Sequence, residues 1–257
     1  MIVLDLELKE IYGFNDFHIN FSYPKKIVNS IIDQEYLKGK PYTSCGDLAA
    51  YYRIQVAANE EGTASVAITE SMIQMWGITK EQLHKDAMQA AHARSPVCLY
   101  DMEEVMAESI FSVKPENLFN REEPLDIGMI PIYILTNQEK LNGASVSVQD
   151  GVLEKVAELL GTNFYVLPSS IHELLILPDN GSMQLSELEA MVREVNATQV
   201  APEDRLSDKV QYYDRETKLL QRGQEKSVLG RLSDKKAQIQ QADHTAPKQP
   251  HRSEVSL

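Results

Sequence analysis

Apolar and polar residues alternate in some stretches of the chain and recur every three to four positions in others, which predicts a mixture of strands and helices. Alternation from Phe17 to Tyr23 is typical of a half-buried strand. Residues 47–58 and 63–70 are two β segments joined by a turn-like Asn-Glu-Glu-Gly sequence, so we expect a hairpin. Further apolar strands are expected at 129–136, 143–150, 163–168 and 173–178.

Helical spacing and capping residues mark the expected helices. Thr79, with Gln82 three residues later, has the spacing of a capping box, and Asp101 is an N-cap for the segment that follows it. Thr136 and Glu139 repeat the capping-box spacing, and Asn142-Gly143 is a type I′ turn signal. The expected helices cover 25–39, 79–94, 102–111, 151–161 and 183–197.

The order of these elements indicates an α+β fold. Hairpin-like strand pairs are mixed with helices, without the regular strand–helix alternation of a parallel doubly wound sheet. A polar, proline-punctuated loop at 113–128 is a candidate boundary between two halves of ordinary domain size. We therefore expect an N-terminal α+β half at 1–112, a C-terminal α+β half at 129–221 and a separate tail at 222–257.

Charge separates this tail from the body. The 257-residue chain has a net charge of -13, whereas the tail alone is +3, because seven Lys and Arg stand there against four Asp and Glu. The tail is poor in apolar residues, so we expect it to be disordered, with Val228, Leu229, Leu232 and Ile239 as an incomplete stripe for docking a protein partner. Nucleic-acid binding by the acidic body is not expected.

The sequence contains no apolar run long enough to cross a membrane, and its N-terminus lacks the basic region of a signal peptide. Two cysteines are too few for a disulfide framework. We expect a cytoplasmic protein that uses no cofactor. His84 and His92 lie about two helical turns apart, too far for one ion, so we expect no metal site.

The densest polar cluster is Ser169, Ser170, His172 and Glu173, between two expected strands. One interpretation makes His172 a base beside a serine, with Glu173 orienting the imidazole ring. The other is a local turn, because catalytic triads are assembled from separated segments. Asn142, Asn196 and Thr198 could add neutral polar groups to a binding surface if the three segments converge.

Three stretches carry a family resemblance: "LTNQEKLNGAS", "FYVLPSSIHELLILPDNG" and "MVREVNATQVAPEDRLSDKVQYYDRET". They resemble the bacterial domain-of-unknown-function family 5688, over about Gly46 to Thr217, and the first 45 residues match less well. Similar proteins are associated with mobile genetic elements of Gram-positive bacteria, and tails like residues 226–241 recur on other proteins of those elements. The resemblance implies no activity and no catalytic residue.

Three functions remain open. The first is a non-catalytic accessory or interaction protein of a mobile element, which is the function we expect. The second is a small-ligand-binding protein or hydrolase-like enzyme that uses the turn at Ser169, Ser170, His172 and Glu173. The third is an acidic mimic of DNA, which requires carboxylates along one exposed face.

Overall fold

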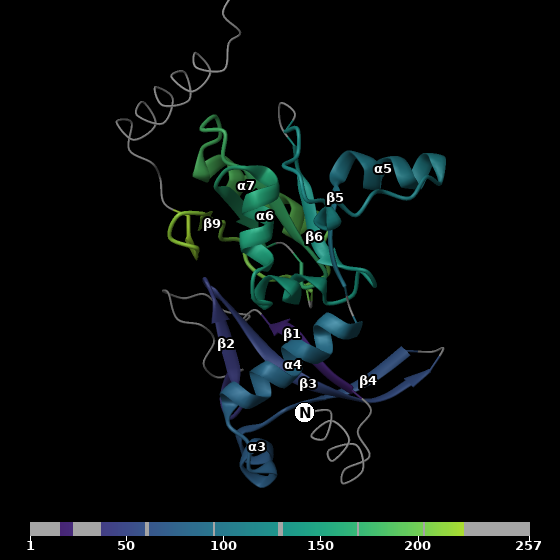
Figure 1. The fold of residues 1–257 in the computed structure, drawn as a ribbon, viewed down its shortest axis with the longest axis vertical. Helices are drawn as coiled ribbons and strands as arrows, with labels where there is room; N and C mark the ends of the chain where they lie inside the picture. The colour runs from purple at the N-terminus through teal and green to yellow at the C-terminus, as the bar shows by residue number, and fades with distance from the viewer. Residues whose placement is uncertain are drawn as a thin grey trace, which may run out of the picture.

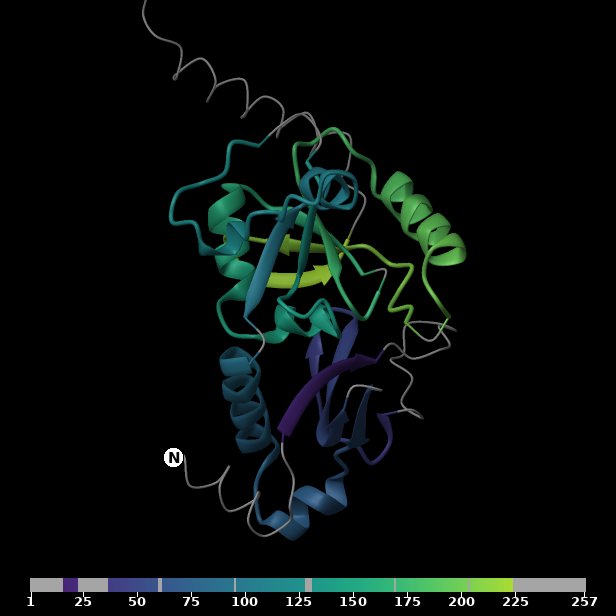
Figure 2. The same ribbon diagram turned by 90° about the vertical axis from the view of Figure 1, so that its right-hand side faces the viewer.

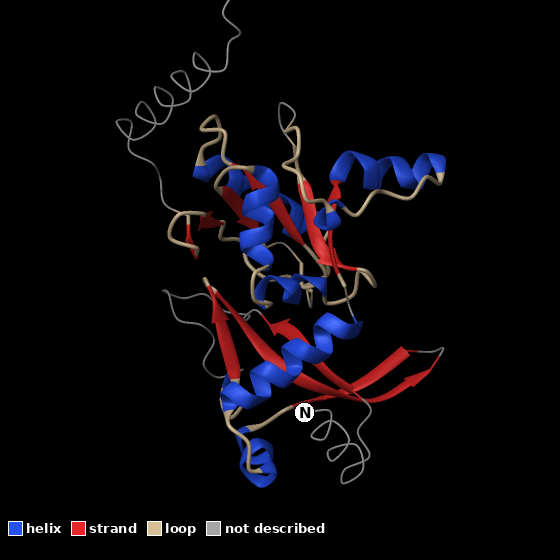
Figure 3. Cartoon of the chain, viewed as in Figure 1, coloured by secondary structure: helices blue, strands red, loops and turns tan. Residues whose placement is uncertain are grey.

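The computed structural model of the chain describes residues 16–22, 37–59, 62–94, 96–127, 131–168, 170–202 and 204–223. These residues form two antiparallel sheets with helices packed on them (Figure 3), so the expected α+β class is confirmed. The helix expected at 25–39 lies outside the described residues up to position 36, and the tail does so from position 224.

The first sheet is built around its longest strand, β3, which pairs antiparallel with the three others (Figure 1). Apolar residues on the two faces of β3 enter different clusters: Tyr52 and Ile54 join the main core, whereas Ala49 and Tyr51 pack on the opposite face. The expected hairpin is present as β3 and β4. The strands are β1 (Asp16–Ser22), β2 (Tyr42–Cys45), β3 (Leu48–Asn59) and β4 (Gly62–Ala67).

Two helices follow this sheet, α3 (Glu70–Trp76) and α4 (Lys80–Arg94). A threonine side chain starts each of them. The Thr69 hydroxyl accepts the amide of Met72, and the Thr79 hydroxyl accepts the amide of Gln82 at 3.1 Å, as the capping spacing of Thr79 predicts. Helix α4 then buries Leu83 and Ala87 in the main core.

The second sheet has six strands in the order β10-β9-β7-β8-β6-β5, and all neighbours are antiparallel. The expected strands at 163–168 and 173–178 form the β7–β8 hairpin. Strands β5, β9 and β10 have no counterpart among the strands expected from the sequence. The strands are β5 (Val97–Asp101), β6 (Tyr133–Asn137), β7 (Phe164–Leu167), β8 (Leu174–Pro178), β9 (Gln211–Asp214) and β10 (Leu219–Arg222).

Helices α6 (Val152–Leu160) and α7 (Leu185–Thr198) cover opposite faces of this sheet (Figure 2). The alternation along β7 explains this arrangement, because successive strand side chains point to opposite faces. Phe164 and Val166 belong to the cluster that contains the buried residues of α6, and Tyr165 and Leu167 to the one that contains those of α7. Two further helices are α5 (Met102–Phe111), which Asp101 caps as predicted, and the short 3₁₀ helix η1 (Leu118–Asn120).

The strand expected at 143–150 is wrong. Gly143–Val148 is a 3₁₀ helix, η2, and only Asn142 of the expected type I′ turn has a positive φ. The hydroxyls of Ser145 and Ser147 donate to carbonyls three residues earlier, a local pairing that competes with a strand. The expected capping box at Thr136 is also wrong, because Thr136 lies within β6.

One apolar core joins the two sheets. It contains Tyr52 of β3, Leu135 of β6 and Phe164 of β7. The chain passes from the first sheet to the second between α4 and β5, near residue 95. The polar loop at 113–128, where the sequence analysis expects a boundary, lies between β5 and β6, two strands that pair with each other.

Candidate functional site

The connection between β7 and β8 contains the polar cluster that the sequence analysis selected. Two other segments hold it in place. Ser170 forms a β-bridge with Arg205, and the Ile171 amide donates to the Asp204 carbonyl at 2.8 Å. On the other side, the Ala144 amide of η2 donates to the Ile171 carbonyl at 3.1 Å. The turn is therefore fixed by backbone bonds to segments about 30 residues away on either side.

His172 uses its backbone and its ring to hold this arrangement. Its carbonyl accepts the Thr136 hydroxyl at 2.8 Å, and its ring Nδ1 accepts the Asn142 amide at 3.1 Å. Because Nδ1 accepts, the ring hydrogen of the neutral form lies on Nε2, which is 3.5 Å from Asp204 Oδ2. Both ring nitrogens therefore face groups of the protein itself.

These contacts differ from a serine–histidine relay. Ser170 Oγ accepts the backbone amide of His172 at 3.0 Å, and the carboxylate beside the imidazole belongs to Asp204. Ser169 lies outside the described residues. The turn does bring Asn142 to His172, as convergence of the segments requires, and the bonds it makes are those of a structural clamp.

Glu173 of the cluster has a shifted pKa. Burial raises its pKa above the ordinary 4.5, and the nearby His172 and Lys140 offset only part of this rise. At neutral pH the ionised Glu173 carboxylate therefore lowers the free energy of unfolding. Below the ordinary pKa, Glu173 is protonated in both the folded and the unfolded chain, and this destabilisation disappears.

Replacing Glu173 with glutamine should therefore raise the free energy of unfolding at pH 7.5, and the gain should fade as the pH is lowered through the folded pKa towards 4. Urea unfolding at the two pH values measures this difference. The matched control is Glu139→Gln, which changes an exposed carboxylate of the same region and should shift neither value. An equal gain at both pH values would contradict the assigned cause.

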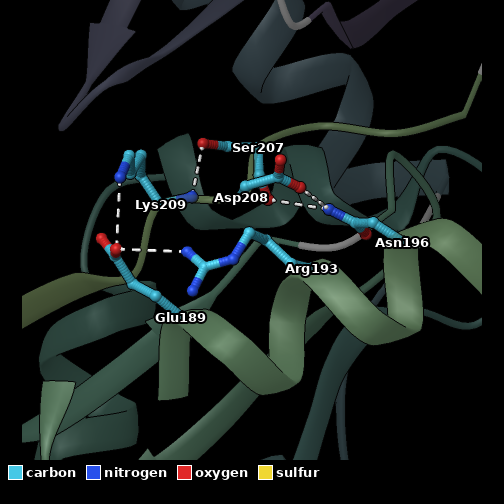
Figure 4. A network of polar contacts seen from close by, with 6 residues as sticks. All are labelled: Glu189, Arg193, Asn196, Ser207, Asp208 and Lys209. Carbon is cyan, nitrogen blue, oxygen red and sulfur yellow. Dashed lines mark hydrogen bonds and ion pairs between the residues drawn. The ribbon is translucent and has the colours of Figure 1, made fainter. Parts of the chain in front are cut away.

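Asn196 belongs to a different network, on α7 (Figure 4). Asn196 is 3% exposed, and its Nδ2 donates to the Ser207 carbonyl at 3.1 Å and to Asp208 Oδ1 at 2.7 Å. Thr198 is exposed, and its hydroxyl donates to the Glu194 carbonyl one turn earlier. The two Asn196 bonds fasten residues 207–208 onto the end of α7, whereas the Thr198 bond stays within the helix.

Two cations complete this network on the outer side of α7. Glu189 lies 3.2 Å from Lys209 Nζ and 3.6 Å from Arg193 Nη1 (Figure 4). Asn196 thus bonds to residues 207–208, whereas His172 contacts Asn142, Thr136, Ser170 and Asp204. Asn142, Ser170 and His172 therefore share one structural network, and Asn196 belongs to a separate one.

A different region presents an unpartnered apolar surface. Helix α5 contains no buried residue and extends away from the second sheet in Figure 1. Four large apolar side chains, on the second half of α5 and just after it, are each at least 64% exposed. They define the α5 surface: Met106, Ile110, Phe111 and Val113.

Polar bonds keep α5 in place although it buries no side chain. The Asp101 carboxylate accepts the amides of Glu103 and Glu104, and Glu104 Oε2 accepts the Glu116 amide at 3.0 Å. Lys140 Nζ lies 3.4 Å from Glu108 Oε2. Hydrogen bonds therefore hold both the start of α5 and the segment at Glu116 that follows the α5 surface.

The chain matches the model of a known protein family. The model of a family described as of unknown function, DUF5688, matches residues 5–215. The chain belongs to this family. The match to DUF5688 begins well before Gly46, so it includes most of the N-terminal segment that resembles the family less closely by its motifs. No curated protein and no solved structure matches the chain.

Two findings bear on the chemistry of this DUF5688 protein. Within the described ranges, no group of three or more His, Cys, Asp or Glu could hold a metal ion. No helix of the described residues has the length and apolarity that crossing a bilayer requires. Among the regions that the structure describes, the α5 surface differs most from an ordinary solvated surface, because monomeric proteins seldom gather large apolar side chains outside their core.

Proposed function

We propose that the chain is a non-catalytic interaction protein whose α5 surface binds in an apolar groove of a protein partner. The observation that carries this proposal is a ten-residue helix with no buried residue and an exposed apolar end. Met106 and Ile110 are four residues apart and so share one face of the helix, which is the spacing of helix-in-groove recognition. Phe111 supplies an aromatic side chain, a residue type enriched at interfaces.

Charge indicates the chemistry of the partner. Helix α5 carries Glu103, Glu104 and Glu108 and no Lys or Arg. Glu103 and Glu104 are exposed, whereas Glu108 lies next to Lys140. The partner groove should therefore be apolar at its centre and basic at its rim, which favours association with an acidic chain.

The setting of this role is an accessory function in a mobile genetic element. Support for this part comes from the family resemblance and from the likeness of residues 226–241 to tails on other proteins of such elements. The tail remains a second candidate docking segment, and only Arg222 and Gly223 of it are described.

The double variant Ile110→Asp and Phe111→Asp should lose partner binding and keep the stability of the parent chain. Central apolar anchors of an interface each contribute about 2 kcal/mol or more, so affinity should fall by at least about 100-fold. Neither side chain is buried, so the free energy of unfolding should change by no more than about 0.5 kcal/mol.

A matched control and a purified partner make this test specific. Met75 on α3 has the same 64% exposure as Met106, so Met75→Asp should leave binding unchanged. A protein cross-linked to the chain in its host is purified and titrated against each variant. Unchanged affinity of the double variant would contradict the proposal, and so would dimerisation of the purified chain through α5 in sedimentation experiments.

A further inference from the structure

The second sheet has two edge strands, and the two edges differ. The strand order places β10 at one edge and β5 at the other, and β9 and α5 accordingly lie on opposite sides of the sheet (Figure 1). The outward N–H and C=O groups of an edge strand can pair with another chain unless something covers them. An uncovered edge is therefore a surface to which an extended segment of another protein can add as a strand.

A side chain covers the β5 edge. Hydrogen bonds to β6 alternate along this antiparallel strand and include residues 96 and 102, so Val97 and Leu99 turn their backbone groups outward. Asn117 Oδ1 accepts the Leu99 amide at 3.0 Å, and Asn117 Nδ2 donates to the Val97 carbonyl at 3.1 Å. One asparagine therefore occupies the backbone positions that an added strand would use.

The β10 edge has no such cover among the described residues. The Gly223 amide, directly after β10, donates to the Val210 carbonyl at 2.9 Å. Bonds to β9 alternate along the strand, so Leu220 and Arg222 turn both of their N–H groups and both of their C=O groups outward. Within the described ranges, no hydrogen bond reaches these outward groups. The second sheet therefore has one closed edge and one open edge.

The side chains along β10 indicate the chemistry of a strand that would fit this edge. Leu219 is 58% exposed, although most large apolar side chains of the chain are buried. Lys218 precedes β10 and Arg222 ends it, and both are exposed. Neither cation forms an ion pair in the part of the chain that the structure describes. The open edge thus has an apolar centre, Leu219 and Leu220, with a cation at each end.

These charges favour an acidic strand over a second copy of the chain. Two β10 strands paired antiparallel about Leu220 would place Lys218 of each copy opposite Arg222 of the other. Like charges directly opposite each other destabilise a sheet. A strand with acidic residues at the same two positions would instead meet each cation with an opposite charge, which favours association.

We propose that β10 binds an extended acidic segment of a protein partner as a seventh, antiparallel strand of the second sheet. The backbone of this segment exchanges hydrogen bonds with Leu220 and Arg222. Its acidic residues lie opposite Lys218 and Arg222, and its apolar residues lie opposite Leu219 and Leu220. The main-chain bonds supply affinity, and the two charges and the apolar centre select the segment.

Hydrogen exchange of the full-length chain tests this geometry, measured by NMR with and without the acetylated and amidated peptide Glu-Thr-Val-Val-Glu. In the free chain, the Leu220 and Arg222 amides should exchange at least about tenfold faster than the Gln221 amide, which faces β9. With the peptide at about ten times its dissociation constant, exchange at Leu220 and Arg222 should slow about tenfold.

Two N-methylated forms of the peptide are matched ligands. In the proposed pairing the first valine lies opposite Leu220, so its N–H points towards β10, whereas the second valine lies opposite Leu219 and its N–H points away. Methylation of the first valine amide removes a hydrogen bond and should weaken binding at least about tenfold. Methylation of the second valine amide should change affinity by less than about twofold.

Charge reversal on the chain provides the matched variants. The parent chain should bind Glu-Thr-Val-Val-Glu at least about tenfold more tightly than Lys-Thr-Val-Val-Lys. The double variant Lys218→Glu and Arg222→Glu should reverse this order. The control is Lys38→Glu with Lys114→Glu, which makes the same change in net charge at two exposed lysines outside β10 and should keep the preference of the parent chain.

Four results would overturn the proposal. The first is that the acidic peptide does not bind, and the second is that both methylated peptides bind equally. The third is that the double variant at Lys218 and Arg222 still prefers the acidic peptide. The last is slow exchange of the outward amides in the free chain, which would show that the tail or a second copy already covers the edge. The α5 surface lies beside the other edge, so the Ile110→Asp and Phe111→Asp variant should bind the peptide as the parent chain does.

Discussion

Replacing Gly143 with alanine should destabilise the chain by about 3 kcal/mol or more, one of the two largest single-residue effects that we expect. A Cβ at this position would lie 2.1 Å from Thr136 Oγ1, 2.5 Å from the His172 carbonyl oxygen and 2.8 Å from the Asn137 amide nitrogen. Two of these three atoms belong to the backbone. Relief therefore requires β6 or the β7–β8 connection to move.

Such a movement would also break the clamp around His172. The bonds from the Thr136 hydroxyl and from the Asn142 amide to His172 both pass beside Gly143. Each contributes about 1 kcal/mol. A loss of about 3 kcal/mol corresponds to a melting temperature about 10 °C lower for a chain of this size.

Calorimetry and urea unfolding of Gly143→Ala measure the effect. The control is Gly181→Ala, at a glycine with no atom within 4 Å of the added Cβ but with a φ of +72°. That variant should lose only about 1–2 kcal/mol from the left-handed backbone. Equal losses for the two variants would contradict the close packing that we assign to Gly143.

Gly46→Ala should have the second large effect, because Gly46 lies where the first sheet contacts the second. Its φ is +57°, and an added Cβ would lie 1.6 Å from the side-chain oxygen of Gln211 in β9. That oxygen accepts the Asp47 amide at 3.0 Å, and Gln211 is fully buried. The side chain therefore has no free space into which to retreat.

The loss should be about 2–4 kcal/mol, from the strained backbone together with the broken bond between Asp47 and Gln211. Because one core joins the two sheets, unfolding in urea should remain a single transition at a lower midpoint. Gly39→Ala is the control, with a similar φ of +72° and no atom near the added Cβ. A Gly46→Ala loss no larger than the control's would show that the contact with Gln211 is not required.

Sequence patterns predicted the elements whose signals are local. Thr79 and Asp101 cap the helices that they were expected to cap, and Gly161 ends α6. A strand was expected at 143–150 because Ala144, Val146 and Val148 alternate with other residues, as in a strand. The structure has a 3₁₀ helix there instead. The burial of these residues comes from that helix, which is packed between the sheets. Alternation alone does not distinguish the two structures.

Sequence patterns could not predict which distant segments contact the turn at His172. The turn at 170–173 was selected from its composition, but the approach of Asp204 to His172 depends on the fold of the 31 residues between them. The α5 surface was missed for a related reason. Met106 and Ile110 have the spacing of a core-facing stripe, and only the structure shows that both side chains are exposed.

The central claim, that the α5 surface binds a partner, is tested most directly by oxidation footprinting of two methionines. Met106 and Met75 are both 64% exposed, so both should oxidise at similar rates in the purified chain. In extract of the native host, Met106 should be protected and Met75 should not. Equal oxidation of both residues in that extract would contradict the claim.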